Sequence, residues 1–282
     1  MLTSGRPLVL AIAIGVLVPS LPIAQQDPST LTDARIEEFL RTAKVVKTRD
    51  PGKGVTASLR ATLSDGTITH DAHIQMVDEF KREFRTPQGL ELDFRDNWRF
   101  NVAAYRIDRL IGLNMTPVSV ERDWNRRPAA VTWWVDDVMM DEGDRMKKNA
   151  TAPVAACWNE QMWLIRMFDQ LIDNTDRNLG NLLITNTWRV WGIDHTRAFR
   201  YARQPRDPSR LGRIDRSILQ RLDALDFETL KREVGRYLND VDIRNMLQRR
   251  DGLVAFFKGV GEKGLFDRRD YGVACAAAPA SR

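Results

Sequence analysis

Three polar side chains that suit phosphate chemistry stand close together in the stretch 168–199. Asp176 and Asn181 are separated by four residues, and Asp194 follows two short apolar runs. In phosphoryl transfer, an Asp can accept the proton of the attacked hydroxyl, an Asn five residues later can hold one magnesium, and a further Asp can hold another. Asp176 and Asn181 have the first of these spacings. The stretch therefore predicts a site for chemistry on a phosphate group.

Short elements on either side are expected to position these residues. Apolar residues in 158–172 predict a helix that enters the turn, and residues 182–184 and 189–193 predict a strand pair that leaves it. Between them, Gly180 is expected to take backbone angles that other residues avoid. The alternative is an ordinary polar turn, because Asn, Asp and Gly are the common turn formers. The flanking helix and strand pair favour the chemical interpretation.

Two of these residues suit a metal ion. Magnesium prefers hard oxygen ligands and usually takes one or two protein carboxylates together with phosphate oxygens and water. The expected hairpin brings Asp194 back toward Asn181. We therefore expect Asn181 and Asp194 to be metal ligands.

The strip resembles the atypical branch of the kinase superfamily, which includes phosphatidylinositol 3- and 4-kinases, HipA-like kinases and secretory-pathway kinases. In that branch the catalytic loop reads D-R-x-x-x-N, matched here by Asp176, Arg177 and Asn181, and these three are the catalytic residues that the resemblance implies. The metal motif of the branch is I-D-x-G-like, and residues 193–196 read I-D-H-T. A His and a Thr replace the usual aromatic and Gly, and neither change removes a metal ligand.

The resemblance implies an α+β, two-lobed protein-kinase-like fold, with a β-rich N-lobe at 43–142, a helical C-lobe at 143–265 and a tail at 266–282. It implies ATP or another nucleoside triphosphate, with Mg²⁺ or Mn²⁺, as cofactors. It also implies transfer of the terminal phosphate to an unknown hydroxyl acceptor, which could be a protein, a lipid or a small molecule. Asp176 would be the base or the group that orients the acceptor.

In the N-lobe, β-type runs at 43–48, 55–63 and 68–77 are separated first by a glycine-containing tip at 50–54. By resemblance this tip would lie over the phosphates, where glycines allow close backbone approach and lysines offer charge. Most such tips are merely turns. The candidate nucleotide-binding residues here are Lys47, Gly52, Lys53 and Gly54.

The stretch 94–113 predicts an amphipathic helix. It resembles a kinase helix in which an upstream Glu pairs with a strand Lys, but here the two positions carry Asn101 and Gln75. Because both positions carry neutral side chains, neither leaves an unpaired buried charge, and the two amides could still hydrogen-bond near the nucleotide. The alternative function is therefore a nucleotide-binding pseudokinase or an interaction module without efficient transfer.

Further along, strands at 117–121 and 130–135 and an acidic connector at 136–142 are expected. Trp133, Trp134 and Met139 could line an adenine pocket, although large apolar residues on strands are more often core. Helical periodicity predicts the C-lobe helices at 213–225, 227–238 and 240–257.

The N-terminus has the pattern of a secretory signal, with Arg6 before an apolar run. Residues 1–24 are expected to be a signal peptide or an uncleaved anchor, followed by a linker and short helix at 25–42, which places the domain outside the cytoplasm, in a periplasm or secreted. There Cys157 and Cys275 could form a bridge, or they could be a buried thiol and a tail thiol. The net charge of +5 over 282 residues is modest and dispersed, so no nucleic-acid partner is expected.

Overall fold

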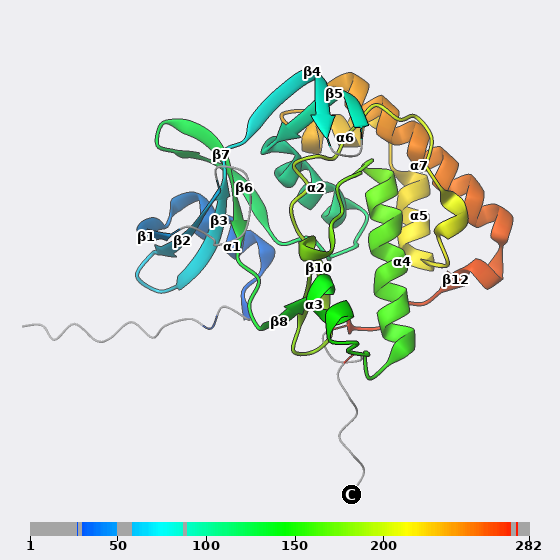
Figure 1. The fold of residues 1–282 in the computed structure, drawn as a ribbon, viewed down its shortest axis with the longest axis horizontal. Coiled ribbons are helices and arrows are strands. Elements are labelled where there is room, and N and C mark those ends of the chain that lie inside the picture. Colours follow the sequence, from blue (N-terminus) through cyan, green and yellow to red (C-terminus); the bar gives the residue numbers. More distant parts are fainter. Residues whose placement is uncertain (1–26, 28–29, 50–57, 87–88, 272–274, 276–282) are drawn as a thin grey trace, which may run out of the picture.

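The computed structural model describes residues 27, 30–49, 58–86, 89–271 and 275, and these form two lobes (Figure 1). The N-lobe is built on an antiparallel sheet with strand order β1-β2-β3-β7-β6, against which α1 (Asp33–Thr42) packs. The helix lies within the range 25–42 in which a linker and a short helix are expected, and Thr32 is its N-cap. The strands are β1 (Lys44–Arg49), β2 (Ser58–Ser64), β3 (Thr69–Gln75), β6 (Ser119–Trp124) and β7 (Arg127–Trp133).

Burial alternates along β3, as expected for a strand with one face on a core. Ala72 and Ile74 are buried beneath α1 with Phe39. The alternate residues, His73 and Gln75, therefore lie on the opposite face of the strand, toward the second lobe. This alternation is what makes β3 one wall of the space between the lobes.

A long hairpin follows the sheet, formed by β4 (Asp78–Thr86) and β5 (Gly89–Asn97), and it leads into α2 (Arg99–Leu110). The predicted helix at 94–113 is therefore wrong in its first turn, because residues 94–97 pair with β4. Phe84 and Phe94 stack across the hairpin with ring centroids 4.2 Å apart, which favours the extended chain. The hairpin projects beyond the N-lobe sheet and contacts α7 of the other lobe through Arg95 and Asp242 (Figure 1).

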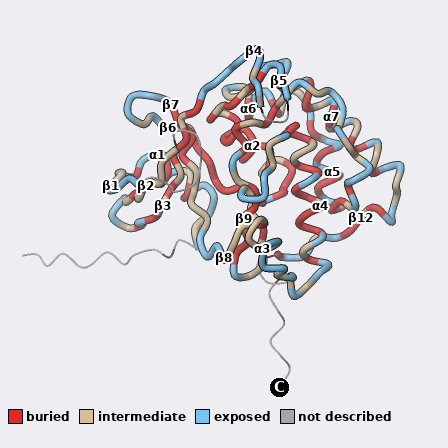
Figure 2. The backbone as a smooth tube through the Cα atoms, in the orientation of Figure 1, coloured by how far each residue is buried: buried red, intermediate tan, exposed pale blue. Residues whose placement is uncertain are grey.

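The C-lobe consists of helices around one apolar core, with a small sheet on the side of the N-lobe (Figures 1 and 2). The helices are α3 (Glu142–Lys147), α4 (Ala155–Leu171), α5 (Arg216–Ala224), α6 (Phe227–Val234) and α7 (Asp240–Val260). The small sheet has the order β10-β9-β8, with β8 (Val138–Asp141), β9 (Leu182–Thr185) and β10 (Val190–Gly192). Short 3₁₀ helices and a two-stranded parallel pair complete it: η2 (Leu179–Asn181), η3 (Pro208–Arg210), β11 (Ile214–Asp215), η4 (Glu262–Gly264) and β12 (Leu265–Phe266).

Side-chain caps set where the C-lobe helices begin. Asp215 accepts from the backbone N–H of Ile218 at the start of α5, and Asp226 caps α6 in the same way. Asn239 and Asp242 form a capping box at the start of α7. These caps explain why α5 begins three residues later than its periodicity predicts.

Cys157 and Cys275 form a disulfide, with their Cα atoms 5.5 Å apart. Of the two alternatives that the sequence leaves open, the bridge is the one present. It ties the C-terminal tail to the first turn of α4, where Gln161 also donates to the Cys275 Sγ at 3.3 Å.

No helix within the described ranges is both long enough and apolar enough to cross a bilayer. The expected signal at 1–24 lies outside those ranges.

Candidate active site

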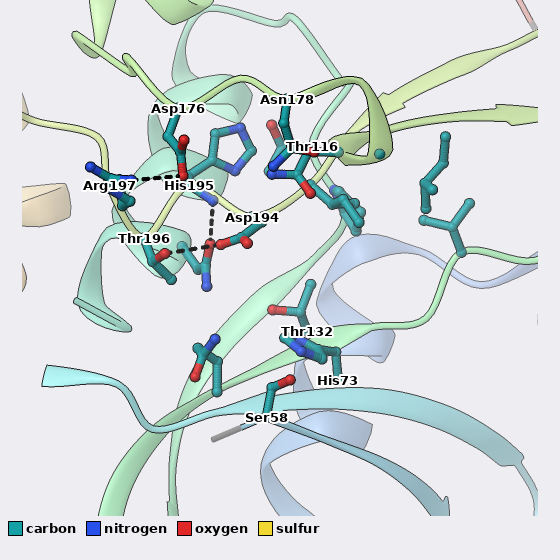
Figure 3. A pocket seen from close by; sticks show the side chains of 18 of the residues that line it. Ser58, His73, Thr116, Thr132, Asp176, Asn178, Asp194, His195, Thr196 and Arg197 are labelled. Atoms are coloured by element: carbon teal, nitrogen blue, oxygen red, sulfur yellow. Dashed lines mark hydrogen bonds and ion pairs between the residues drawn. The ribbon is translucent and has the colours of Figure 1, made fainter. Parts of the chain in front are cut away.

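A cleft of about 970 Å³ lies between the lobes and collects residues from both (Figure 3). Its N-lobe wall includes Ser58, His73 and Thr132. Asp176, Asn181 and Asp194 line the C-lobe side. The local hairpin of β9 and β10 therefore brings together the three side chains that the sequence singles out.

Arg177 fixes the loop 176–181 through contacts to the residues on both sides of it. Its guanidinium binds the Asp169 carboxylate of α4 with Nε and Nη2, at distances down to 2.9 Å. Its Nη1 donates to the carbonyl oxygens of Asn181 and Ile193 at 3.2 and 2.6 Å. One side chain thus joins the helix before the loop, the loop itself and the strand end before Asp194. Arg177 is not among the described cleft-lining residues, so the structure gives it a positioning role.

Asp194 has a left-handed backbone with φ of 53°. Such a conformation costs energy for a non-glycine residue and often marks a functional position. Thr196 donates its hydroxyl to Asp194 Oδ1 at 3.0 Å, and the backbone N–H of His195 donates to Asn101 Oδ1 at 2.7 Å. These two bonds, drawn in Figure 3, hold the turn that aims Asp194 into the cleft. Gly180 shows no unusual angle, contrary to expectation, because it lies within η2.

The two amides at the expected ion-pair positions bind backbone groups. Gln75 Oε1 accepts from the N–H groups of Met76 and Val77 at 3.0 and 3.2 Å, which turns the chain from β3 into the hairpin. Asn101, on α2, is 6% exposed and fixes His195 as described above. Both line the cleft.

Arg197 connects Asp176 to the β4–β5 hairpin. Its guanidinium lies 3.3 Å from Asp176 Oδ2 and 2.7 Å from Glu91 Oε2. Arg200 also pairs with Glu91. Burial favours the neutral form of Glu91, but the two guanidinium groups outweigh it and hold its pKa below the usual range. Sequence periodicity gives no sign of this contact, because residue 91 and residue 197 meet only through the tertiary fold.

The cleft is rich in acidic groups. Its described lining includes no lysine, and Arg197 is its one arginine. Burial lowers the pKa of His73, although Asp194 opposes this, and burial together with Arg177 lowers the pKa of His195 well below its ordinary value. Both imidazoles are therefore neutral at pH 7. The lining carboxylates are Glu79, Asp96, Asp141, Asp144, Asp176 and Asp194.

A nucleoside triphosphate and the carboxylates of this cleft are both negatively charged. The nucleotide could therefore bind there only together with cations that neutralise the two sets of charges. The residues present fit a hard divalent cation, because Asn181 and Asp194 offer oxygen ligands from adjacent turns. Asp96 Oδ1 is in addition a buried oxygen without a hydrogen-bond partner. No group of three or more His, Cys, Asp or Glu side chains in the described chain is arranged as a complete metal cage. Phosphate oxygens and water would therefore have to complete the coordination.

The other candidate positions divide into three groups. Trp133, Trp134 and Met139 line the cleft, as expected for an adenine pocket. Lys47 is exposed on β1, where it pairs with Thr62, and is not brought to the cleft. The last group lies outside the described residues: Gly52, Lys53 and Gly54.

No protein-family model matches the chain, and no curated protein sequence matches it significantly. The chain does match solved structures. A hydra Fam20 protein with sugar is 15% identical with a TM-score of 0.61, covering 88% of this chain and 96% of that one. The Golgi casein kinase with Mn and ADP bound is 13% identical with a TM-score of 0.58, covering 92% and 83%. The Helicobacter pylori proinflammatory kinase CtkA is 10% identical with a TM-score of 0.50, covering 77% and 96%.

The chain thus has a protein-kinase-like α+β fold, and its structural neighbours include atypical kinases of the secretory pathway. This confirms the fold class predicted from the sequence. Features specific to phosphatidylinositol kinases or HipA-like kinases receive no support from the comparisons.

Proposed function

We propose that this chain is a phosphotransferase that moves the terminal phosphate of ATP, or of another nucleoside triphosphate, to a hydroxyl group. The observation that carries the proposal is that Asp176, Asn181 and Asp194 converge on one interlobe cleft. The kinase-like fold raises the expectation, while the function rests on these side chains.

Asp176 is the base, or the group that orients the acceptor hydroxyl. Its side chain is 46% exposed, so an acceptor can reach it from solvent, and Arg197 fixes its orientation. Asn181 and Asp194 hold the divalent cation. When bound, that cation neutralises the triphosphate and aligns its terminal phosphate for transfer. The Mn and ADP bound to the Golgi casein kinase that shares the fold support this choice of cofactors.

The expected site of action is outside the cytoplasm. The N-terminal signal pattern, the Cys157–Cys275 disulfide and the secretory-pathway neighbours all agree with an oxidising compartment. The acceptor is a hydroxyl-bearing protein, lipid or small molecule met there.

A nucleotide-binding pseudokinase is the second candidate. It is favoured by Gln75 and Asn101, which replace the Lys and Glu that the resemblance implies and which hydrogen-bond to backbone groups. Without that lysine, binding could persist while transfer is slow. This candidate predicts stabilisation by nucleotide and cation without turnover.

Release or transfer of the terminal phosphate from labelled ATP separates the two candidates. Water serves as the acceptor where none is known, and protein and lipid pools serve as added acceptors. For a phosphotransferase, Asp176→Asn should lower the rate by roughly 100-fold or more, because it removes the base and leaves the side-chain size unchanged. Binding of ATP without any transfer would favour the pseudokinase, and a rate unaffected by the substitution would contradict the role of Asp176.

A further inference from the structure

Asp96 is the buried carboxylate in the cleft whose surroundings are hardest to explain by folding alone. It lies on β5, directly opposite Glu79, and is 8% exposed. Its Oδ1 has no hydrogen-bond partner, and no Lys or Arg side chain in the described ranges lies within ion-pair distance of it. A buried carboxylate oxygen without a hydrogen-bond partner is costly. It nevertheless opens onto the cleft rather than into a core.

Asp96 lies against the turn that carries Asp194. The backbone N–H of Asn97 donates to the Thr196 carbonyl oxygen at 2.8 Å, which ties the end of β5 to this turn. The Thr196 hydroxyl donates to Asp194 Oδ1, and the same side chain is a hydrogen-bond neighbour of Asp96. The two carboxylates are therefore held around one hydroxyl group. Figure 3 shows Thr196 and Asp194 joined at this point.

The cleft supplies little positive charge for these two carboxylates. Its described lining contains no lysine, and Arg197, its one arginine, is paired with Glu91 and Asp176. Carboxylates that share one partly buried site are stable only when a proton or a cation lies with them. Gln75 and Asn101 are engaged with backbone groups.

We propose that Asp96 is a protein ligand of the divalent cation that Asp194 holds. The orphaned Oδ1 is the oxygen that the cation would take, and the hairpin and the C-lobe turn would then close on one ion. This rests on the proposed function, because the cation enters with the nucleotide. It adds an N-lobe ligand to a site that the sequence assigns to Asn181 and Asp194 alone.

Manganese binding to the full-length protein, measured by electron paramagnetic resonance with and without ATP, tests this directly. Asp96→Asn and Asp194→Asn should each weaken Mn²⁺ binding roughly tenfold or more, as the loss of one oxygen ligand predicts. Asp144→Asn is the matched control, because it removes one charge from another element that lines the same cleft, α3, and it should change the affinity less than about twofold.

Folding is checked by the melting temperature without metal. Asp96→Asn should melt at or above the temperature of the unmodified protein, because it removes an unpaired buried charge. Mn²⁺ binding that survives Asp96→Asn but is lost in Asp194→Asn would overturn the role of Asp96 and leave the proposed function standing. Absence of Mn²⁺ binding in the unmodified protein with ATP would overturn both. An equal loss of Mn²⁺ affinity in Asp144→Asn would also overturn the role of Asp96, because it would show that the affinity depends only on the net charge of the cleft.

Discussion

Arg177 shows how one side chain can fix a reactive loop without entering the cleft. Its planar guanidinium meets the Asp169 carboxylate with two nitrogens, and its third nitrogen meets two carbonyl oxygens. A lysine has the same charge but only one nitrogen, so it cannot keep both sets of contacts. The geometry of Asn181 and of the turn before Asp194 should therefore depend on this residue.

Arg177→Lys should lower the free energy of unfolding by about 2–3 kcal/mol, because hydrogen bonds between charged, partly buried groups are lost. It should also weaken the stabilisation that ATP and Mn²⁺ provide. Urea denaturation measures the first effect and thermal melting the second. Arg210→Lys is the control, since that side chain is 83% exposed and should change neither quantity measurably. Equal results for the two variants would contradict the positioning role.

The sequence predicts Asp176, Asn181 and Asp194 because local structure alone brings them together. A turn and one hairpin suffice, and both have clear residue patterns. Asp96 and His73 could not be predicted in the same way. They lie on strands of the N-lobe and line the cleft only because the two lobes pack around it, and a polar residue on a strand carries no sign of what it will face.

At the scale of elements, the β4–β5 hairpin is the feature that sequence periodicity misses. Phe84 and Phe94 pack against each other across the two strands, and Phe94 also packs on the Arg197 side chain, rather than on one helical face. The hairpin is docked on the C-lobe at two places, on α7 and on the stretch 197–200. Arg95 binds Asp242 of α7 with two nitrogens, and Glu91 binds Arg197 and Arg200.

Glu91→Gln should lower the melting temperature at pH 7 by roughly 2–5 °C, because two guanidinium groups lose their carboxylate. The pKa of Glu91 is lower in the folded state than in the unfolded chain. Glu91 therefore contributes fully to the stability of the fold above its unfolded pKa of about 4.3, and this contribution is lost as the pH falls through its folded pKa. The difference between variant and unmodified protein should therefore shrink below about pH 4. Melting curves from pH 7 to 3 measure this, and a difference independent of pH would contradict the ion pairs.

At the scale of the whole molecule, a β-rich lobe and a helical lobe enclose the cleft, and a disulfide ties the tail to the larger lobe. The resemblance of the stretch 168–199 to atypical kinases makes this two-lobed arrangement predictable, and the strands followed by helical periods agree with it. The pairing of Cys157 with Cys275 is not predictable in the same way, because 118 residues separate them and only the packing of the tail against α4 brings them together.

Replacing both cysteines by serine should destabilise the chain by about 2–5 kcal/mol, since the bond closes a long loop. Reductant should lower the melting temperature of the unmodified protein and have no effect on the double variant. A reductant effect of equal size on both proteins would show that the bond contributes nothing to stability.

The most direct test of the central claim is the melting temperature of the full-length protein with and without ATP plus Mg²⁺ or Mn²⁺, beside Asp194→Asn. Asparagine tolerates the left-handed backbone at this position, so the variant removes charge without adding strain. Ligand at a hundredfold above its dissociation constant should stabilise by roughly 2.7 kcal/mol. If the cleft binds nucleotide together with a cation, the melting temperature rises only when the cation is present, and the rise is lost in the variant. No shift in either protein would contradict a nucleotide site in this cleft.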